Sequence, residues 1–196
     1  MNSLKNKIKE VSAPLMDRRK FIRMGLITAA AAMVPCNALA SALESVSEVR
    51  ELHFYNLYTH EDLKVTYWRD GWYIPEALSE INHIFRDLRT GKVKSIKKEL
   101  LDLLFNIRKK IDVDEPFQLV SGYRSPRSNA LLSKKKKGVA KNSLHMYGKA
   151  VDIRVPGCSL STLRRAAQKL EMGGVGYYPR SHFVHVDVGE VRYWRG

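Results

Sequence analysis

The sequence contains little cysteine and no apolar run long enough to span a membrane. Its cysteines are Cys36 and Cys158. The longest apolar run, residues 24–34, has about eleven residues, which is too short to cross roughly 30 Å of hydrocarbon. If Cys36 leaves with an N-terminal leader, no intrachain disulfide can form. The fold must then be stabilised by packing or by a bound metal.

Acidic residues are also scarce, since 20 Asp and Glu stand against 34 Lys and Arg, a formal charge of +14. Residues 1–40 hold seven Lys or Arg and two Asp or Glu, so residues 41–196 keep about +9. A basic domain suits contact with a polyanion, such as a cell-wall polymer or an anionic cell-envelope surface. Because no nucleic-acid recognition motif accompanies the charge, we expect no nucleic-acid partner.

The N-terminal segment has the pattern of an export signal. Paired arginines, Arg18 and Arg19, precede the apolar run, and the small-residue exit Ala38-Leu39-Ala40 follows it. Paired arginines are typical of the bacterial twin-arginine route. We therefore expect residues 1–40 to be a signal peptide and residues 41–196 to form one periplasmic, monomeric domain. Its 156 residues suffice to bury a core.

Beyond residue 50, strands and helices follow one another without a regular alternation. Hydrophobic periodicity predicts strands at 52–57, 63–68, 117–120, 150–155, 175–178 and 183–188. It predicts helices at 75–89, 96–111 and 160–170, and a further one from Pro126. Arg89 and Gly91 close the first helix, while Ser95 and Ser125 cap the helices that follow them. The last two strands form a hairpin, so we expect an α+β fold whose antiparallel β-sheet is flanked by helices.

Two of the predicted strands carry ionisable residues on one face. Side chains alternate across a strand, so AVDIRV (150–155) places its apolar residues on one face and Asp152 on the other. In FVHVDV (183–188) the valines share one face, and His185 and Asp187 lie on the opposite face. Pairing within one sheet would bring Asp152 and His185 together.

His145, shortly before the first of these strands, can fold back over the same surface. Two imidazoles and one carboxylate, here His145, Asp152 and His185, are a common ligand set for catalytic zinc, with a fourth position for water. Zinc lowers the pKa of that water and polarises a carbonyl group. Histidine and aspartate residues on a sheet surface are also common without a metal, and the spacing alone leaves both interpretations open.

Three ordered motifs resemble those of the M15 metallopeptidases. SLHMYGKAVDI (143–153) resembles the signature S-x-H-x-x-G-x-A-x-D of that family. SGYRSPRSN (121–129) resembles its S-G-[YF]-R-S loop, and FVHVDVG (183–189) resembles its closing H-x-D segment. The order of the motifs, followed by a terminal RYW, is similar to the murein endopeptidase K subfamily, and the similarity covers nearly all of residues 50–195.

The resemblance implies a zinc fold shared with lysostaphin-type enzymes, D-Ala-D-Ala peptidases and the hedgehog N-domain. It implies Zn²⁺ bound by the three residues named above. Arg124 would lie in the cleft and stabilise a substrate carboxylate or carbonyl; a structural ion pair is the alternative. The candidates for the general base are His182 and Asp187. His182 stands where some M15 enzymes have a glutamate, but strand alternation turns it away from His185. Asp187 lies on the correct face, or it orients a ligand imidazole instead.

The function implied is a zinc-dependent murein endopeptidase that hydrolyses peptide cross-links of peptidoglycan during wall growth or remodelling, with stem peptides as its substrate. Two alternatives remain open. One is a D,D-carboxypeptidase or dipeptidase acting on uncross-linked stems, which a cleft with a closed end would favour. The other is a non-catalytic wall-binding module with a structural zinc, which a closed four-ligand site would favour.

Overall fold

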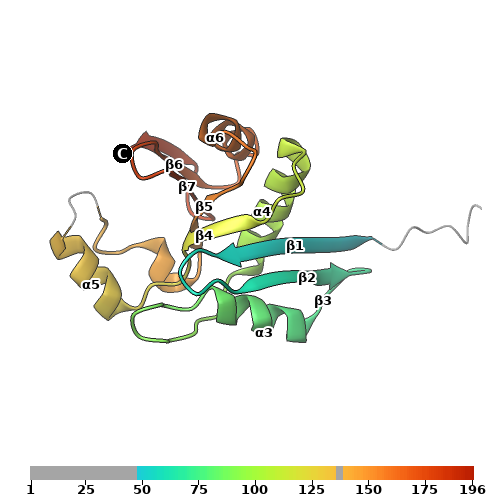
Figure 1. The fold of residues 1–196 in the computed structure, drawn as a ribbon, viewed down its shortest axis with the longest axis horizontal. Coiled ribbons are helices and arrows are strands. Elements are labelled where there is room, and N and C mark those ends of the chain that lie inside the picture. Colours follow the sequence, from blue (N-terminus) through green and yellow to red (C-terminus); the bar gives the residue numbers. More distant parts are fainter. Residues whose placement is uncertain (1–47, 136–138) are drawn as a thin grey trace, which may run out of the picture. The chain divides into compact units, whose positions relative to one another are not determined.

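A computed structural model describes residues 48–135 and 139–196 of the 196-residue chain. The signal peptide predicted for residues 1–40 lies outside these ranges. Within them, eight strands form one sheet in the order β3-β2-β1-β4-β5-β7-β6-β8 (Figure 1). No helix in this part of the chain combines the length and the apolarity that a membrane span requires.

The elements follow the expected order along the chain. The strands are β1 (Val49–Asn56), β2 (Asp62–Arg69), β3 (Trp72–Tyr73), β4 (Phe117–Ser121), β5 (Ala150–Arg154), β6 (Gly174–Tyr178), β7 (Phe183–Asp187) and β8 (Arg192–Arg195). The helices are α3 (Pro75–Ile84), α4 (Lys98–Ile111), α5 (Pro126–Lys135), the 3₁₀ turn η2 (Leu144–Tyr147) and α6 (Leu160–Gln168).

The sheet is mixed rather than purely antiparallel. The α+β class is confirmed, but β1 pairs with β4, and β6 with β8, in parallel. Parallel pairs need a crossover connection. Helices α3 and α4 connect β1–β3 to β4. After β7 the chain crosses β6 and forms β8 on the far side of β6. The strands β4, β5, β7 and β6 are antiparallel to one another, as expected.

Helices α3, α4 and α6 share one hydrophobic core with the sheet. Alternation in β5 and β7 sends Val151, Ile153, Val184 and Val186 into this core, where they are fully buried. Complete burial of each such side chain contributes roughly 1.5–3 kcal/mol. Helix α5 adds no residue to this core and buries Ser128 and Asn129 instead. The opposite face of β5 and β7 is therefore left for polar side chains.

Two helix boundaries differ from those predicted. Helix α3 ends at Ile84 rather than Arg89, because the Asp87 carboxylate accepts the backbone N–H groups of Arg89 and Thr90 and forms a turn there. Helix α4 begins at Lys98, so Ser95 is not its cap. The segment before α4 packs on η2 instead, since the N–H of Lys97 donates to the carbonyl of Gly148 at 2.9 Å.

Candidate metal centre

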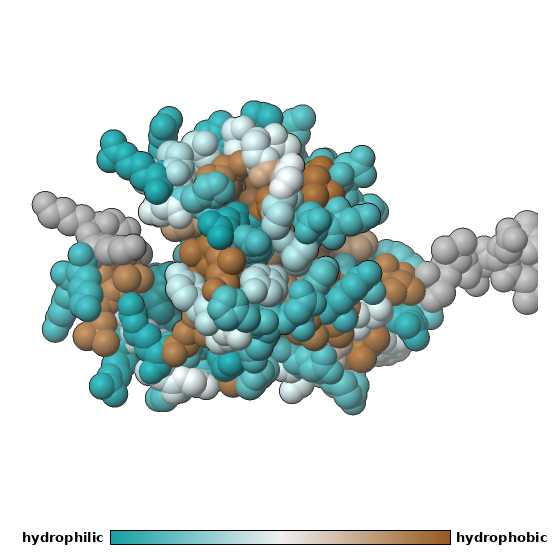
Figure 2. Space-filling view, viewed as in Figure 1, coloured by the Kyte–Doolittle hydropathy of each residue, from teal (hydrophilic) through white to brown (hydrophobic). Residues whose placement is uncertain are grey.

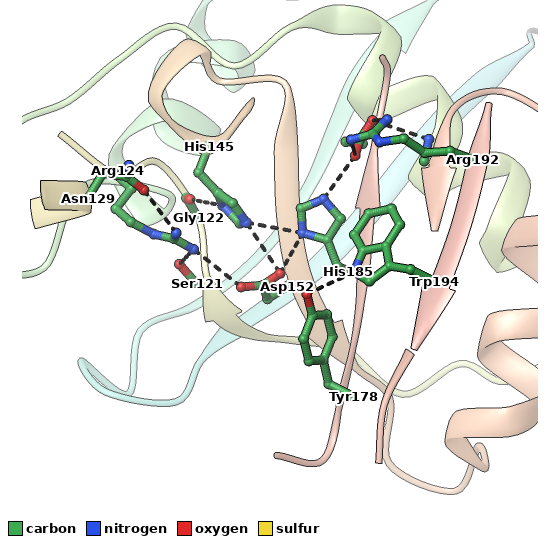
Figure 3. A network of polar contacts seen from close by, with 12 residues as sticks. Ser121, Gly122, Arg124, Asn129, His145, Asp152, Tyr178, His185, Arg192 and Trp194 are labelled. Carbon is green, nitrogen blue, oxygen red and sulfur yellow. Dashed lines mark hydrogen bonds and ion pairs between the residues drawn. The ribbon is translucent and has the colours of Figure 1, made fainter. Parts of the chain in front are cut away.

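Sheet register places two of the predicted ligands side by side. Asp152 on β5 lies directly opposite His185 on β7, and the Oδ1 of Asp152 lies 2.8 Å from the Nδ1 of His185. The turn η2 adds His145, whose Nε2 lies 3.3 Å from the same oxygen and 3.2 Å from the Nδ1 of His185 (Figure 3). All three side chains are buried. The structure thus brings together the three residues that the motifs singled out.

Backbone groups fix the orientation of His145. Its Nδ1 donates to the carbonyl of Gly122 at 2.7 Å, so this nitrogen carries the proton of the neutral ring. Gly122 is required for close packing, because a Cβ atom there would lie 2.5 Å from the carbonyl oxygen of Phe85. Gly148, in the left-handed region at φ 64°, closes the turn that carries His145. The glycines of both motifs therefore position this imidazole.

Asp187 fixes the orientation of His185. The Nε2 of His185 donates to the Oδ2 of Asp187 at 3.0 Å, and Arg192 donates to the same oxygen at 2.7 Å. The backbone N–H groups of Gly174 and Gly189 also donate to Asp187, which is fully buried. Burial acts to raise the pKa of Asp187, but the hydrogen bonds from His185 and Arg192 hold it well below its usual range. Asp187 is therefore an ionised acceptor behind the imidazole.

When both rings are neutral, these outer hydrogen bonds leave three lone pairs facing one another. The facing atoms are the Nε2 of His145, the Nδ1 of His185 and the Oδ1 of Asp152, and ligand atoms of the three residues all lie within 4.8 Å of one another. Such an arrangement is repulsive unless a cation lies among the three atoms. Two imidazole nitrogens and one carboxylate oxygen fit the preference of zinc.

Without a metal, a proton must serve as that cation. Burial lowers the pKa of His145, which therefore stays neutral. Burial also acts to lower the pKa of His185, but the hydrogen bonds to Asp152 and Asp187 raise it to about 9. Burial acts to raise the pKa of Asp152, but the charges and hydrogen bonds of the two imidazoles hold it far below its usual range. Asp152 thus stays ionised, and without a metal the extra proton on His185 takes the place of the cation.

Arg124 lies beside Asp152, on the side away from His185 (Figure 3). Its Nη2 lies 3.5 Å from the Oδ2 of Asp152 and 3.3 Å from the Oγ of Ser121, while its Nη1 donates to Asn129 at 3.3 Å. Burial lowers the pKa of Arg124. The side chain also lines the cavity at the cluster, so it combines an ion pair with access to a substrate.

The two candidates for the general base lie away from the facing atoms. Asp187 lies behind His185 and is held there by Arg192. His182 is exposed in the turn between β6 and β7, at φ 56°, and is not among the residues that line the cavity. His182 does lie away from His185, but the turn sets its direction rather than strand alternation, because His182 precedes β7.

Strand β8 contributes two side chains that the motifs did not reveal as part of the site. Arg192 reaches Asp187, and Trp194 lies over Gly176, where a Cβ atom would come within 2.6 Å of the indole ring. The ring centroid of Trp194 is 5.3 Å from that of His185. Glycine at alternate positions of β6, Gly174 and Gly176, makes room for these side chains. In the sequence, these alternating glycines were the signal from which the contact of Arg192 and Trp194 with β6 could have been inferred.

A cavity of about 1,060 Å³ opens over the cluster. One bank comes from residues 86–89, α5 and residues 139–144, and the other from the turn between β6 and β7 and the end of β8. Figure 2 shows the surface hollowed between the part built on α5 and the part built on β6 and β7. Within the described ranges, the lining residues Arg89 and Arg180 have no ion pair. The cavity therefore offers unpaired positive charge on both banks.

Comparisons with known proteins agree with this geometry. The model of a peptidase M15 family described as "Peptidoglycan L,D-endopeptidase MepK" matches residues 44–194. A protein of that name from Escherichia coli (strain K12) is 42% identical over 178 residues, which cover 91% of this chain and 97% of the relative. The "Probable peptidoglycan L,D-endopeptidase MepK" of Haemophilus influenzae is 35% identical over 181 residues, 92% of this chain and 96% of the relative. The zinc D-Ala-D-Ala carboxypeptidase of Streptomyces albus G is 33% identical over 84 residues, 41% of this chain and 31% of the relative.

Proposed function

The chain belongs to the M15 peptidase family of the peptidoglycan L,D-endopeptidases MepK, and we propose that it is a zinc-dependent endopeptidase of peptidoglycan cross-links. The observation that carries this proposal is the convergence of three lone pairs from His145, Asp152 and His185 at the base of an open cavity. The three residues would hold the metal. When bound, zinc supplies a Lewis acid that polarises the scissile carbonyl and lowers the pKa of a water molecule.

The surrounding residues then have distinct tasks. The Gly122 carbonyl and Asp187 fix the two imidazole rings, and partners of this kind raise metal affinity. We assign Asp187 this orienting task and give His182 no catalytic role. The carboxylates that line the cavity are Asp152, which faces the cluster, and Asp87, which is hydrogen-bonded at the start of α5. Neither of them is free to act as a separate base.

Arg124 is the residue we propose to bind the substrate beside the cluster. Its guanidinium offers a fork of donors, and only part of that fork is used by Asp152, Ser121 and Asn129. The distances to these partners, 3.3–3.5 Å, are long for charge-assisted hydrogen bonds. A substrate carbonyl or carboxylate can therefore bind Arg124 in the cavity.

The charge of the cavity supports an anionic peptide substrate on both sides of the scissile bond. Arg89 lies on one bank, and Arg180 lies on the other. A carboxypeptidase needs cationic groups only where the terminal carboxylate binds, whereas stem peptides joined by a cross-link carry carboxylates on both sides. This arrangement favours an endopeptidase over a D,D-carboxypeptidase.

A non-catalytic wall-binding module fits the site less well. In the part of the chain that the structure describes, the only cluster suited to a metal has three protein ligands, and a structural zinc site has four. We further propose that the protein is exported through the twin-arginine route to the periplasm, where it acts as a monomer. The basic surface suits the anionic envelope there.

The test uses the purified full chain, loaded with zinc, and defined cross-linked muropeptide dimers. We expect mass spectrometry to show conversion of dimers to monomers, lost on chelation and regained with zinc. The matched control is His182→Ala, which changes an exposed histidine next to β7 and should keep full activity. Trimming of free stems with dimers left intact would instead establish the carboxypeptidase. Tight zinc binding without any hydrolysis would establish the binding module.

A further inference from the structure

Tyr178, at the end of β6, is the cavity-lining phenol nearest in the sheet to His185. Its ring stacks on Phe183, with centroids 4.5 Å apart and planes 21° apart. Its hydroxyl oxygen accepts a hydrogen bond from the Nε1 of Trp194 at 2.8 Å. In Figure 3, Tyr178 and Arg124 reach toward Asp152 from opposite sides. The phenol is therefore held at both its ring and its oxygen.

The direction of this hydrogen bond determines what the hydroxyl can do. Indole nitrogen is a donor only, so the oxygen of Tyr178 must be the acceptor and its own proton remains available. No group within residues 48–135 and 139–196 accepts that proton. Tyr178 lines the cavity, so the free O–H group is available to a bound substrate.

Trp194 is itself fixed by the residues of the site. It lies on Gly176, the register partner of both His185 on β7 and Trp194 on β8. Its ring also packs against His185. The hydrogen bond of 2.8 Å holds the half-buried indole N–H on the hydroxyl of Tyr178. The position of the tyrosine hydroxyl is thus tied to that of a metal-ligand candidate.

We propose that Tyr178 is a catalytic residue whose hydroxyl donates a hydrogen bond to the carbonyl oxygen of the scissile amide as that oxygen gains negative charge, and that Trp194 is its positioning residue. The inference rests on the proposed peptidase function. The proton stays on the tyrosine, so no group is transferred. Preorganised donors at such an oxygen commonly account for 10²–10³-fold in kcat.

The test is Tyr178→Phe, which keeps the ring stack with Phe183 and removes only the oxygen. We expect kcat on a cross-linked muropeptide dimer to fall about 10²-fold. KM should stay within about twofold, because the hydrogen bond forms mainly in the transition state. Zinc content and melting temperature should match those of the wild type. The matched control is Tyr177→Phe, the same change one residue earlier on the core side of β6, which should leave kcat unchanged.

Trp194→Phe separates positioning from contact with the substrate. We expect a loss in kcat of about tenfold for this variant. The double variant with Tyr178→Phe should be no slower than Tyr178→Phe alone, because both changes remove the same contribution, that of the positioned Tyr178 hydroxyl. An unchanged kcat in Tyr178→Phe, with an active wild type, would overturn the inference and leave the peptidase function standing. A loss of zinc or of melting temperature that accounts for the lost rate would make Tyr178 structural, which also overturns it. A wild type that binds zinc but does not cleave would overturn both proposals.

Discussion

Two acid-centred clusters in this protein show how a structural site differs from a ligand site. Asp102 on α4 accepts hydrogen bonds from the hydroxyl of Tyr67 at 3.0 Å, from that of Tyr73 at 2.6 Å and from Arg50 at 3.0 Å. Every partner of Asp102 is a donor. Asp152, in contrast, faces two imidazole nitrogens, and in the neutral rings the proton lies on the far side, toward Gly122 and Asp187.

The difference lies in the balance of donors and acceptors. The Asp102 cluster joins α4 to β1, β2 and β3, and both oxygens of its carboxylate accept hydrogen bonds from donors within the cluster. Burial raises the pKa of Tyr73 to about 12, with the hydrogen bond to Asp102 adding to the shift, so this phenol stays a donor at all physiological pH values. The Asp152 cluster has no donor of its own while both imidazoles are neutral, so it needs a cation, either an extra proton on His185 or a metal ion. Two clusters that are each centred on an aspartate therefore have different roles.

The largest effect should come from removing a ligand at the second cluster. His185→Ala takes away one of the three facing lone pairs, and we expect dimer hydrolysis to fall by at least about 10³-fold, since the metal would be lost. The measurement is the rate of dimer cleavage with zinc in excess. Full activity in this variant would show that His185 is not a metal ligand.

Removing the carboxylate of the first cluster should cost stability and spare the metal. Asp102→Ala leaves the buried Tyr67 hydroxyl without its acceptor, and we expect the free energy of unfolding to fall by about 3 kcal/mol. Urea denaturation measures this loss. Zinc content should remain that of the wild type below the unfolding transition. A loss of zinc in the folded variant would erase the distinction between the two clusters.

A smaller effect is expected from the residue that orients His185. Asp187→Asn keeps the shape of the side chain but removes the charge that holds the imidazole tautomer. We expect zinc affinity, measured by competition with a chelating dye, to fall 10–100-fold. Hydrolysis should recover at saturating zinc. A failure to recover at full zinc occupancy would assign Asp187 a direct part in the chemistry.

The smallest effect concerns a third carboxylate, that of Asp87, whose hydrogen-bond partners are also all donors. Burial acts to raise its pKa, but hydrogen bonds from Ser125 and Ser128 lower the pKa to about 2. Because the folded pKa lies below the ordinary value of 3.8, its contribution is present above pH 4 and is lost as the pH falls through 2. We expect Asp87→Asn to be less stable than the wild type by about 2 kcal/mol at pH 7. The gap, followed by thermal unfolding, should close towards pH 2; a constant gap would mean that Asp87 does not act as an anion.

Much of the site could be predicted because its determinants are local. Strand alternation separated Asp152 and His185 from the apolar face, and the motif around His145 fixed the third residue. The match of the M15 family confirms the resemblance from which the function was inferred.

Other features depend on contacts between distant segments. The parallel pairing of β8 with β6 depends on Gly174 and Gly176 accepting Arg192 and Trp194, which no periodicity in β8 reveals. The task of Asp187 likewise depends on Arg192 lying behind it. The early end of α3 depends on Asp87, whose carboxylate also holds the start of α5.

The most direct test of the account is the zinc content of the purified protein after equilibration with zinc and removal of the free metal. Mass spectrometry of the metal should give one zinc per wild-type chain, one per Asp102→Ala chain and none per Asp152→Ala chain. Retention of zinc by Asp152→Ala, or its absence from the wild type, would contradict the claim that the lone pairs of His145, Asp152 and His185 form a metal site.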